Sequence, residues 1–328
     1  MEPSEPEGAL RSPLWLDTAA EIERIGAWLR HAIGTQLHKR GAVLGVSGGV
    51  DSAVCAALAT RALGPERVTA LLMPERESSD DSLQRGIELC TLLGIAHQVI
   101  ELTPVLEAMG CYQQRDAAIQ TIVPGYGPGW CCHLAIAGGL SGGINFFHLK
   151  VQDPQGAVQS QRLPLASYLQ IVAATNHKQR VRKTQEYFHA DRLNRAVLGT
   201  PNRLEHELGF FVKQGDGLAD VKPIAHLYKT QVYRLAQAMG LPHSICTAAP
   251  TTDTYTLSQG QDTFFYGLPY AELDLALWSF NSAGGPAEVA CQLGCSLQRA
   301  EHIVRDIAAK KAMAQSLYTQ GLSLLPGA

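Results

Sequence analysis

The segment Ala42-Val-Leu-Gly-Val-Ser-Gly-Gly-Val-Asp-Ser52 constrains the fold more than any other part of the chain. Its first five residues are short and apolar, which predicts a buried strand. Ser47-Gly-Gly predicts a tight turn, and the residues from Ser52 to about Leu63 predict a helix. The chain is therefore expected to pass from a buried strand through a glycine turn directly into a helix.

The segments around this turn predict an α/β fold. Residues 17–40 carry apolar side chains at helical spacing, and Val68–Met73 and Ile95–Leu102 are apolar enough to be further strands. Ser79 is placed to cap a helix between those two strands. Strands that alternate with helices predict a doubly wound parallel sheet with right-handed crossovers. Ligands bind such sheets at the carboxyl ends of the strands, where the glycine turn lies.

The second half of the chain continues the pattern. Arg195–Thr200 predicts another strand, and Leu227–Met239 has the apolar spacing of a helix that ends at Gly240. The region from about Tyr270 to Leu317 is expected to be helical. We therefore predict a flexible N-terminal tail, residues 1–16, followed by a single domain, residues 17–328.

Residues from about 111 to 170 interrupt this pattern and predict an insertion. Ile144–Val151 and Ala157–Leu163 are suited to two strands of a β-hairpin. Asp153-Pro-Gln-Gly156 between them has the residues that a type I turn favours.

Composition excludes several classes of protein. The chain has 27 basic and 30 acidic residues, and its net charge of -3 argues against a general nucleic-acid binder. No apolar run approaches the ~18 residues that a membrane span needs, and the acidic start is unlike a secretory signal. The eight cysteines are scattered without a CxxC pair, which favours packing over disulfides or metal binding. We expect a soluble, cytoplasmic protein that binds neither membrane nor nucleic acid.

The glycine turn has the chemistry of a phosphate site. Its glycines let backbone N–H groups approach an anion, and the helix that follows adds its positive end. Ser47 and Ser52 add hydroxyl donors, whereas Asp51 would repel a bare phosphate and so implies a bridging divalent cation. The lysine of the GxxxxGK[ST] motif is absent. The alternative is a turn that merely packs the strand against the helix.

Ser47-Gly-Gly-Val-Asp-Ser52 resembles the pyrophosphate loop of the N-type ATP pyrophosphatases. These enzymes cleave ATP between the α- and β-phosphates and activate a carboxylate or carbonyl as its adenylate. They include NAD synthetase, GMP synthetase, asparagine synthetase and several tRNA-modifying enzymes. The loop alone does not choose among them.

A run of later motifs resembles NAD synthetase of the ammonia-dependent type. The motifs keep their spacing over about 75 residues: Asn176-x-Lys178-x-Arg180-x-Arg182, Gly199-Thr200, Glu205, Gly209-Phe-Phe-Val-Lys213-Gln-Gly-Asp216-Gly-Leu-Ala-Asp220, Leu227-Tyr-Lys229 and Ala249-Pro-Thr251-x-Asp253.

The resemblance implies a role for each matching residue. Magnesium would be held by Asp51 and Glu205, and Asp51, Lys229 and Asp216 would serve catalysis, with Asp216 orienting or deprotonating the ammonium ion. Deamido-NAD would be held by Arg180, Lys213 and Asp220, the first two across the interface of a homodimer. ATP would be bound by Gly45, Val46, Ser47, Gly48, Gly49, Val50, Asp51, Ser52, Thr200, Lys229 and Thr251.

The implied reaction joins ammonia to the nicotinate carboxyl of deamido-NAD through an acyl-adenylate and releases AMP and pyrophosphate. The nitrogen would come from free ammonia or from a separate glutaminase partner. Three alternatives stay open: amidation of nicotinate mononucleotide, another amide ligase with this loop, and a nucleotide-binding module without catalysis. The family often ends in a His-Lys pair, where this chain has Lys310-Lys311, so that contact is not transferred.

Overall fold

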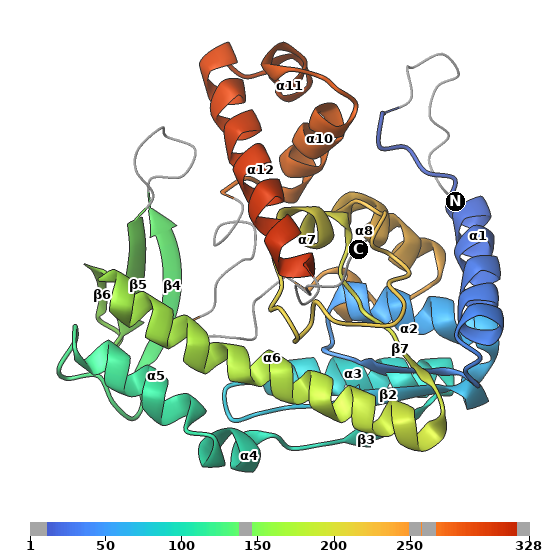
Figure 1. Cartoon of the computed structure of the whole chain (residues 1–328), viewed down its shortest axis with the longest axis horizontal. Helices are drawn as coiled ribbons and strands as arrows, with labels where there is room; N and C mark the ends of the chain where they lie inside the picture. The colour runs from blue at the N-terminus through green and yellow to red at the C-terminus, as the bar shows by residue number, and fades with distance from the viewer. Residues whose placement is uncertain (1–11, 138–145, 249–256, 258–266, 320–328) are drawn as a thin grey trace, which may run out of the picture.

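The chain contains a parallel sheet, which lies among helices in the lower right part of Figure 1. The computed structural model describes residues 12–137, 146–248, 257 and 267–319. Within them the sheet has the strand order β3-β2-β1-β7, and every neighbouring pair is parallel. The strands are β1 (Ala42–Gly45), β2 (Val68–Leu72), β3 (Ala96–Val99) and β7 (Ala196–Val197). The predicted α/β parallel sheet is confirmed, although β7 is shorter than the sequence suggested.

Helices cover both faces of this sheet, as a doubly wound fold requires. Side chains along β1 alternate between two core clusters, because successive residues of a strand point to opposite faces: Ala42 and Leu44 join one and Val43 joins the other. The first cluster contains side chains of α1 (Thr18–Arg30), α2 (Val50–Leu63), α3 (Asp80–Leu93) and α8 (Lys229–Ala238). The second contains side chains of α4 (Thr103–Ala108), α5 (Cys111–Gln120) and α6 (Leu165–Leu193).

Local sequence signals set the ends of these helices. Ser79 caps α3 by accepting a hydrogen bond from the backbone N–H of Ser82, as predicted. Gly94 ends α3 in the left-handed region with a φ of 64°. Helix α1 continues as a short π-helix, η1 (His31–Gln36), so the helical segment ends sooner than predicted, and η2 (Pro65–Arg67) is a 3-10 turn before β2.

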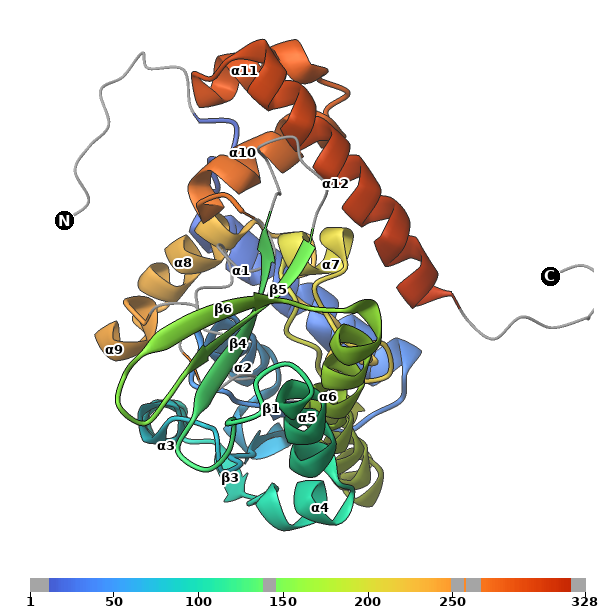
Figure 2. The same cartoon turned by 90° about the vertical axis from the view of Figure 1, so that its left-hand side faces the viewer.

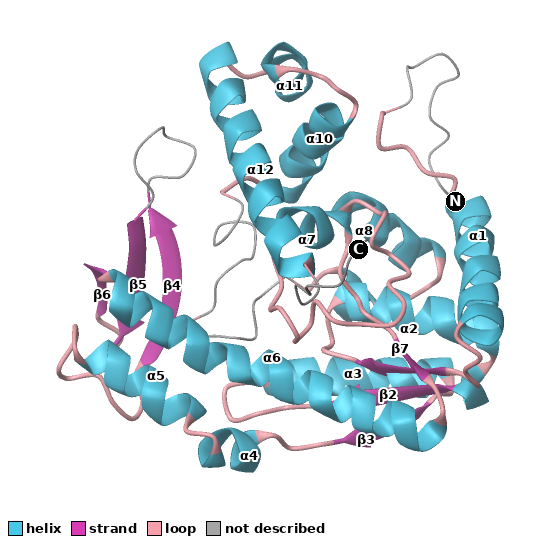
Figure 3. Ribbon diagram, in the orientation of Figure 1, coloured by secondary structure: helices cyan, strands magenta, loops and turns pink. Residues whose placement is uncertain are grey.

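The predicted hairpin is confirmed, within a larger antiparallel sheet of order β4-β5-β6. The hairpin strands are β5 (Phe146–Gln152) and β6 (Val158–Arg162), and their turn is closed by a bond from Gly156 N to Asp153 O of 3.0 Å. Strand β4 (Cys131–Ala137) was not predicted. Figure 3 shows the two sheets as separate groups of strands, with α6 running past both.

The C-terminal region is helical, as predicted. It contains α10 (Tyr270–Asn281), α11 (Pro286–Leu293) and α12 (Leu297–Tyr318), which project from the α/β core in Figure 2. The shorter helices α7 (Arg203–Leu208) and α9 (His243–Cys246) precede it. No helix in the described ranges is both long and apolar enough to cross a membrane.

The predicted flexible tail, residues 1–16, needs correction. Leu14 is buried in the core cluster of the C-terminal helices, and its carbonyl accepts a hydrogen bond from Gln231. Residues 12–16 are therefore partly anchored by apolar burial, and residues 1–11 lie outside the described part.

Candidate active site

A cavity of about 850 Å³ lies at the carboxyl end of β1. The entire segment Gly45–Ser52 lines it, together with Thr200 and parts of α6 and α12. The far wall comes from the predicted insertion, where the Phe147 and Tyr168 rings stack with centroids 3.6 Å apart. The glycine turn and the insertion therefore share one cavity, which the sequence did not reveal.

The turn before α2 is fixed by its own hydroxyl groups and by α3. Ser52 Oγ donates to Gly49 O at 3.0 Å and accepts from Ser47 N at 3.3 Å. Gly48 has a φ of 78°, and a Cβ atom there would lie 2.3 Å from the carbonyl oxygen of Ser82 on α3. Only glycine fits this close approach, which explains why the turn needs a glycine at this position.

Three charged side chains gather beside the turn. Lys229 forms an ion pair with Asp51. Asn202 donates from Nδ2 to Asp51 Oδ1 at 3.2 Å, and Glu205 Oε2 accepts the backbone N–H of Asn202 at 3.0 Å. Asn202 was not predicted as a site residue, yet the spacing Asn202-x-x-Glu205 is a capping-box signal that the sequence contains.

The electrostatics of this group favour a cation between the carboxylates. Burial, together with the nearby charge of Asp51, raises the pKa of Glu205 to about 8. Burial would lower the pKa of Lys229, but the carboxylates of Asp51 and Glu205 raise it above its ordinary value. Two hard carboxylate oxygens that repel each other fit Mg²⁺, which commonly takes one or two carboxylates beside phosphate oxygens. Among the residues described, His, Cys, Asp and Glu form no metal-binding group of three or more.

Lys229 is held in place from its backbone. It is the first residue of α8, where a cation opposes the helix dipole. The buried carboxylate of Asp274 on α10 accepts the backbone N–H groups of Lys229 and Thr230, at 3.2 and 2.8 Å. With its backbone anchored in this way, the Lys229 ammonium reaches toward the glycine turn.

The residues predicted to hold the dinucleotide are only partly brought together. Arg180 donates from Nε to Lys213 O at 3.3 Å, and both side chains line the cavity. Asp216 lines it too, and its Oδ1 accepts the backbone N–H of Val212 at 2.7 Å. Asp220 is not among the lining residues and instead accepts from Tyr187 and from the backbone of Val197. Thr251 lies outside the described residues.

Lys178, in the same basic run as Arg180, is buried in a network of ion pairs. Its fully buried ammonium lies 3.0 Å from Glu75 and 2.6 Å from Glu77. Arg115 of α5 forms a third ion pair in this network, 2.6 Å from Glu77. Burial would raise the pKa of Glu77, but the two cations hold it below its usual range. The network joins α5 and α6 to the segment after β2.

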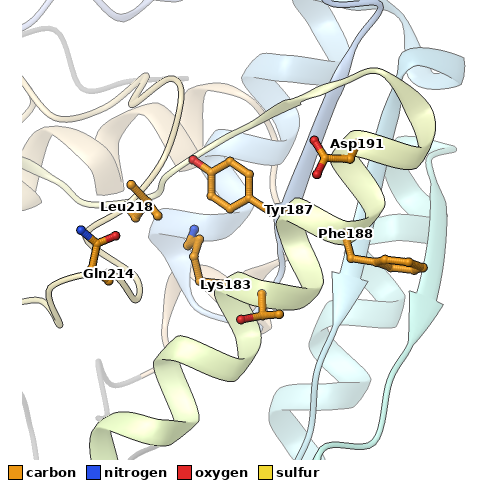
Figure 4. A pocket seen from close by; sticks show the side chains of 7 residues that line it. Lys183, Tyr187, Phe188, Asp191, Gln214 and Leu218 are labelled. Atoms are coloured by element: carbon orange, nitrogen blue, oxygen red, sulfur yellow. The ribbon is translucent and has the colours of Figure 1, made fainter.

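A smaller pocket of about 400 Å³ is lined by α6 and by the loop that carries Gln214 and Leu218 (Figure 4). Figure 4 shows Tyr187 on α6 facing the loop that carries Gln214 and Leu218. Lys183 lines both this pocket and the larger cavity, and it forms an ion pair of 2.6 Å with the buried Glu186. None of the predicted site residues lines this pocket.

Comparison with known proteins decides the family. The sequence profile of the family described as NAD synthase matches residues 21–125 and 136–313. The chain belongs to the NAD synthase family. It is 50% identical over 310 residues to the NH(3)-dependent NAD(+) synthetase of Mesorhizobium japonicum, covering 94% of this chain and 97% of that protein. The corresponding Rhizobium meliloti protein is 51% identical over 306 residues, with 93% and 91% covered.

Solved structures of an NAD synthetase and of an NMN synthetase share the fold. The NH3-dependent NAD synthetase from Campylobacter jejuni superposes with a TM-score of 0.63 at 20% identity, over 95% of this chain and 100% of that one. NMN synthetase from Francisella tularensis gives 0.64 at 24% identity, over 94% and 99%. The family match leaves residues 126–135 unmatched, inside the predicted insertion. That residues 111–170 are an insertion as a whole stays a prediction.

Proposed function

We propose that this chain is an ammonia-dependent NAD synthase, a ligase that converts deamido-NAD to NAD at the expense of ATP. The observation that supports it most directly is the group of Asp51, Glu205 and Lys229 beside a glycine turn that lines a large cavity. The two rhizobial relatives, half identical over nearly the whole chain, support the choice of substrate.

In this reaction the glycine turn binds the β- and γ-phosphates of ATP through backbone N–H groups and the start of α2. A carboxylate oxygen of deamido-NAD attacks the α-phosphorus, the bond to the bridging oxygen breaks, and pyrophosphate leaves with that electron pair. The ammonium of Lys229, whose backbone N–H is held by Asp274, faces the charge that develops on the leaving group. Ammonia then attacks the acyl carbon, the bond from that carbon to the AMP phosphate oxygen breaks, and AMP departs while the nitrogen loses a proton to solvent. Thr200 and, by resemblance, Thr251 complete the ATP site.

We assign the metal site to Asp51 and Glu205, where burial, together with the nearby charge of Asp51, raises the pKa of Glu205. When bound there, Mg²⁺ would neutralise phosphate charge and act as a Lewis acid. Asn202 orients both ligands, since its side chain bonds Asp51 and its backbone bonds Glu205.

Arg180 and Lys213 are proposed to hold the anionic groups of deamido-NAD, supported by their adjacency at the cavity wall. Asp216 is proposed to orient the ammonium ion, although its bond to Val212 also suits a turn. Activity retained in Asp216→Asn with ammonia would remove this role. The contribution of Asp220 would be indirect, through Tyr187 and Val197. A homodimer, a separate glutaminase partner and a cytoplasmic location remain predictions.

The test is product analysis. Chain incubated with Mg²⁺, ATP, deamido-NAD and ammonium is expected to yield NAD, AMP and pyrophosphate in equal amounts, and glutamine alone is expected to yield little. A competition between deamido-NAD and nicotinate mononucleotide measures the preference between dinucleotide and mononucleotide. Preferential amidation of the mononucleotide, or no pyrophosphate release with either substrate, would contradict the proposal.

A further inference from the structure

The glycine turn lacks a cation of its own. In the GxxxxGK[ST] phosphate loop a lysine directly follows the glycines, and no lysine follows these glycines. Lys229 reaches the turn but is paired with Asp51. The ion pair of Asp51 and Lys229 has no net charge, and Glu205, whose pKa burial and the charge of Asp51 raise to about 8, adds no positive charge where a polyphosphate would bind.

Arg85 of α3 contacts this turn directly. Its Nε donates to Gly48 O at 3.2 Å, and its Nη2 donates to Ser82 Oγ at 3.1 Å. The half-buried guanidinium lines the same cavity as the turn. A guanidinium has five N–H donors, so three of them make no hydrogen bond to the described residues. Within those residues no carboxylate forms an ion pair with it.

The bond to Gly48 also sets the direction of a peptide group. In a trans peptide the C=O and the following N–H point in opposite directions. With the carbonyl of Gly48 directed at Arg85, the N–H of Gly49 points to the other side, toward Ser47 Oγ at 3.3 Å. Because this carbonyl is held by Arg85, its partial negative charge is compensated at the edge of the anion site.

We propose that Arg85 is a phosphate-binding residue that supplies the positive charge missing from the glycine turn. One edge of the guanidinium holds the Gly48 carbonyl, and the other binds the pyrophosphate portion of ATP and the pyrophosphate that leaves. A planar guanidinium suits this double task, since it offers N–H donors in a rigid fork that matches phosphate oxygens. This role rests on the proposed ATP-cleaving function and adds a residue to its site.

The test is calorimetric titration of inorganic pyrophosphate, in the presence of Mg²⁺, into the wild-type chain and three variants. R85Q retains a donor for the Gly48 carbonyl but has no charge, and R85K retains the charge without the fork. R61Q is the matched control, because Arg61 forms an exposed ion pair with Glu23 and does not line the cavity. R85Q is expected to weaken binding about ten- to hundredfold, the value of one hydrogen bond to a charged group.

R85K is expected to bind with intermediate affinity and R61Q with wild-type affinity. Wild-type affinity in R85Q would overturn the proposal, as would equal weakening in R85Q and R85K, which would mean that Arg85 only holds the turn. Should R85Q fail to fold, R85M takes its place: binding weaker than that of R85K supports the proposal, and an affinity equal to that of R85K or of the wild type overturns it. The titration needs neither dinucleotide nor turnover, so it can succeed or fail independently of the proposed reaction.

Discussion

The raised pKa of Glu205 predicts that Mg²⁺ binding releases a proton. Burial and the charge of Asp51 favour the protonated form of this carboxyl in the free site, with a pKa of about 8. A metal ion binds the ionised form. The affinity for Mg²⁺ should therefore rise with pH until it passes the pKa and then level off, which is the sign expected for a carboxyl whose pKa is raised.

The magnitude follows from the pKa. At about pH 7 only about one-tenth of a carboxyl with a pKa of about 8 is ionised, so binding should release about 0.9 proton per site. Below the pKa, each decrease of the pH by about one unit should weaken the apparent affinity for Mg²⁺ about tenfold. An ordinary glutamate, with a pKa near 4.5, would release almost no proton at the same pH.

The assay is calorimetric titration of Mg²⁺ with a non-hydrolysable ATP analogue, repeated in buffers of different ionisation enthalpy. The matched control is Glu205→Gln, which retains an oxygen to accept the N–H of Asn202 and so preserves the capping box of α7. The proton release attributable to the site is the difference between wild type and variant, because the nucleotide contributes equally to both. Equal proton release in the two proteins, or an affinity independent of pH between about 6 and 8, would refute the reasoning.

Three further perturbations follow from the site. Lys178→Met leaves the charges of Glu75 and Glu77 partly uncompensated in the core. It is expected to lower the free energy of unfolding, measured by urea titration, by about 3–5 kcal/mol. A loss below about 1 kcal/mol would contradict this prediction. Lys229→Ala is expected to lower kcat for pyrophosphate release about 10²- to 10³-fold, since it removes a charge facing the leaving group; unchanged kcat would exclude that role. Tyr168→Ala removes the stack on Phe147 at the wall of the cavity that we propose binds deamido-NAD, and is expected to raise KM for deamido-NAD about two- to tenfold, with kcat nearly unchanged; an unchanged KM would exclude a contribution of this stack to dinucleotide binding.

The features that could be predicted from sequence depend on neighbours along the chain. The glycine turn, the Ser79 cap and the glycine end of α3 are each fixed by hydrogen bonds within a few residues. The hairpin of β5 and β6 is of the same kind, because the turn at Asp153 determines its register. The residues of the charged site were also indicated by motif spacing, with Asp51, Glu205 and Lys229 gathering as the resemblance implied.

Features that depend on distant contacts were missed. Residues 138–145 separate β4 from β5 in the sequence, and the pairing of the two strands is visible only in the fold. Arg85 meets the glycine turn from 37 residues away, through the packing of α3 on Gly48. Residues 12–16 were included in the flexible tail that the acidic, proline-bearing start of the chain predicts, whereas Leu14 is buried by helices from the other end of the chain.

The basic run on α6 shows why residue type and motif do not assign a role without geometry. Residues two apart on an α-helix point about 200° from one another, and residues four apart point in nearly the same direction. Lys178 and Arg182 accordingly reach the same segment after β2, the former through Glu75 and Glu77 and the latter through Met73 O at 3.3 Å. Arg180 lies on the opposite face, exposed, and reaches Lys213. One face of α6 thus fixes the loop beside the glycine turn, and the other leaves Arg180 available to bind an anionic substrate.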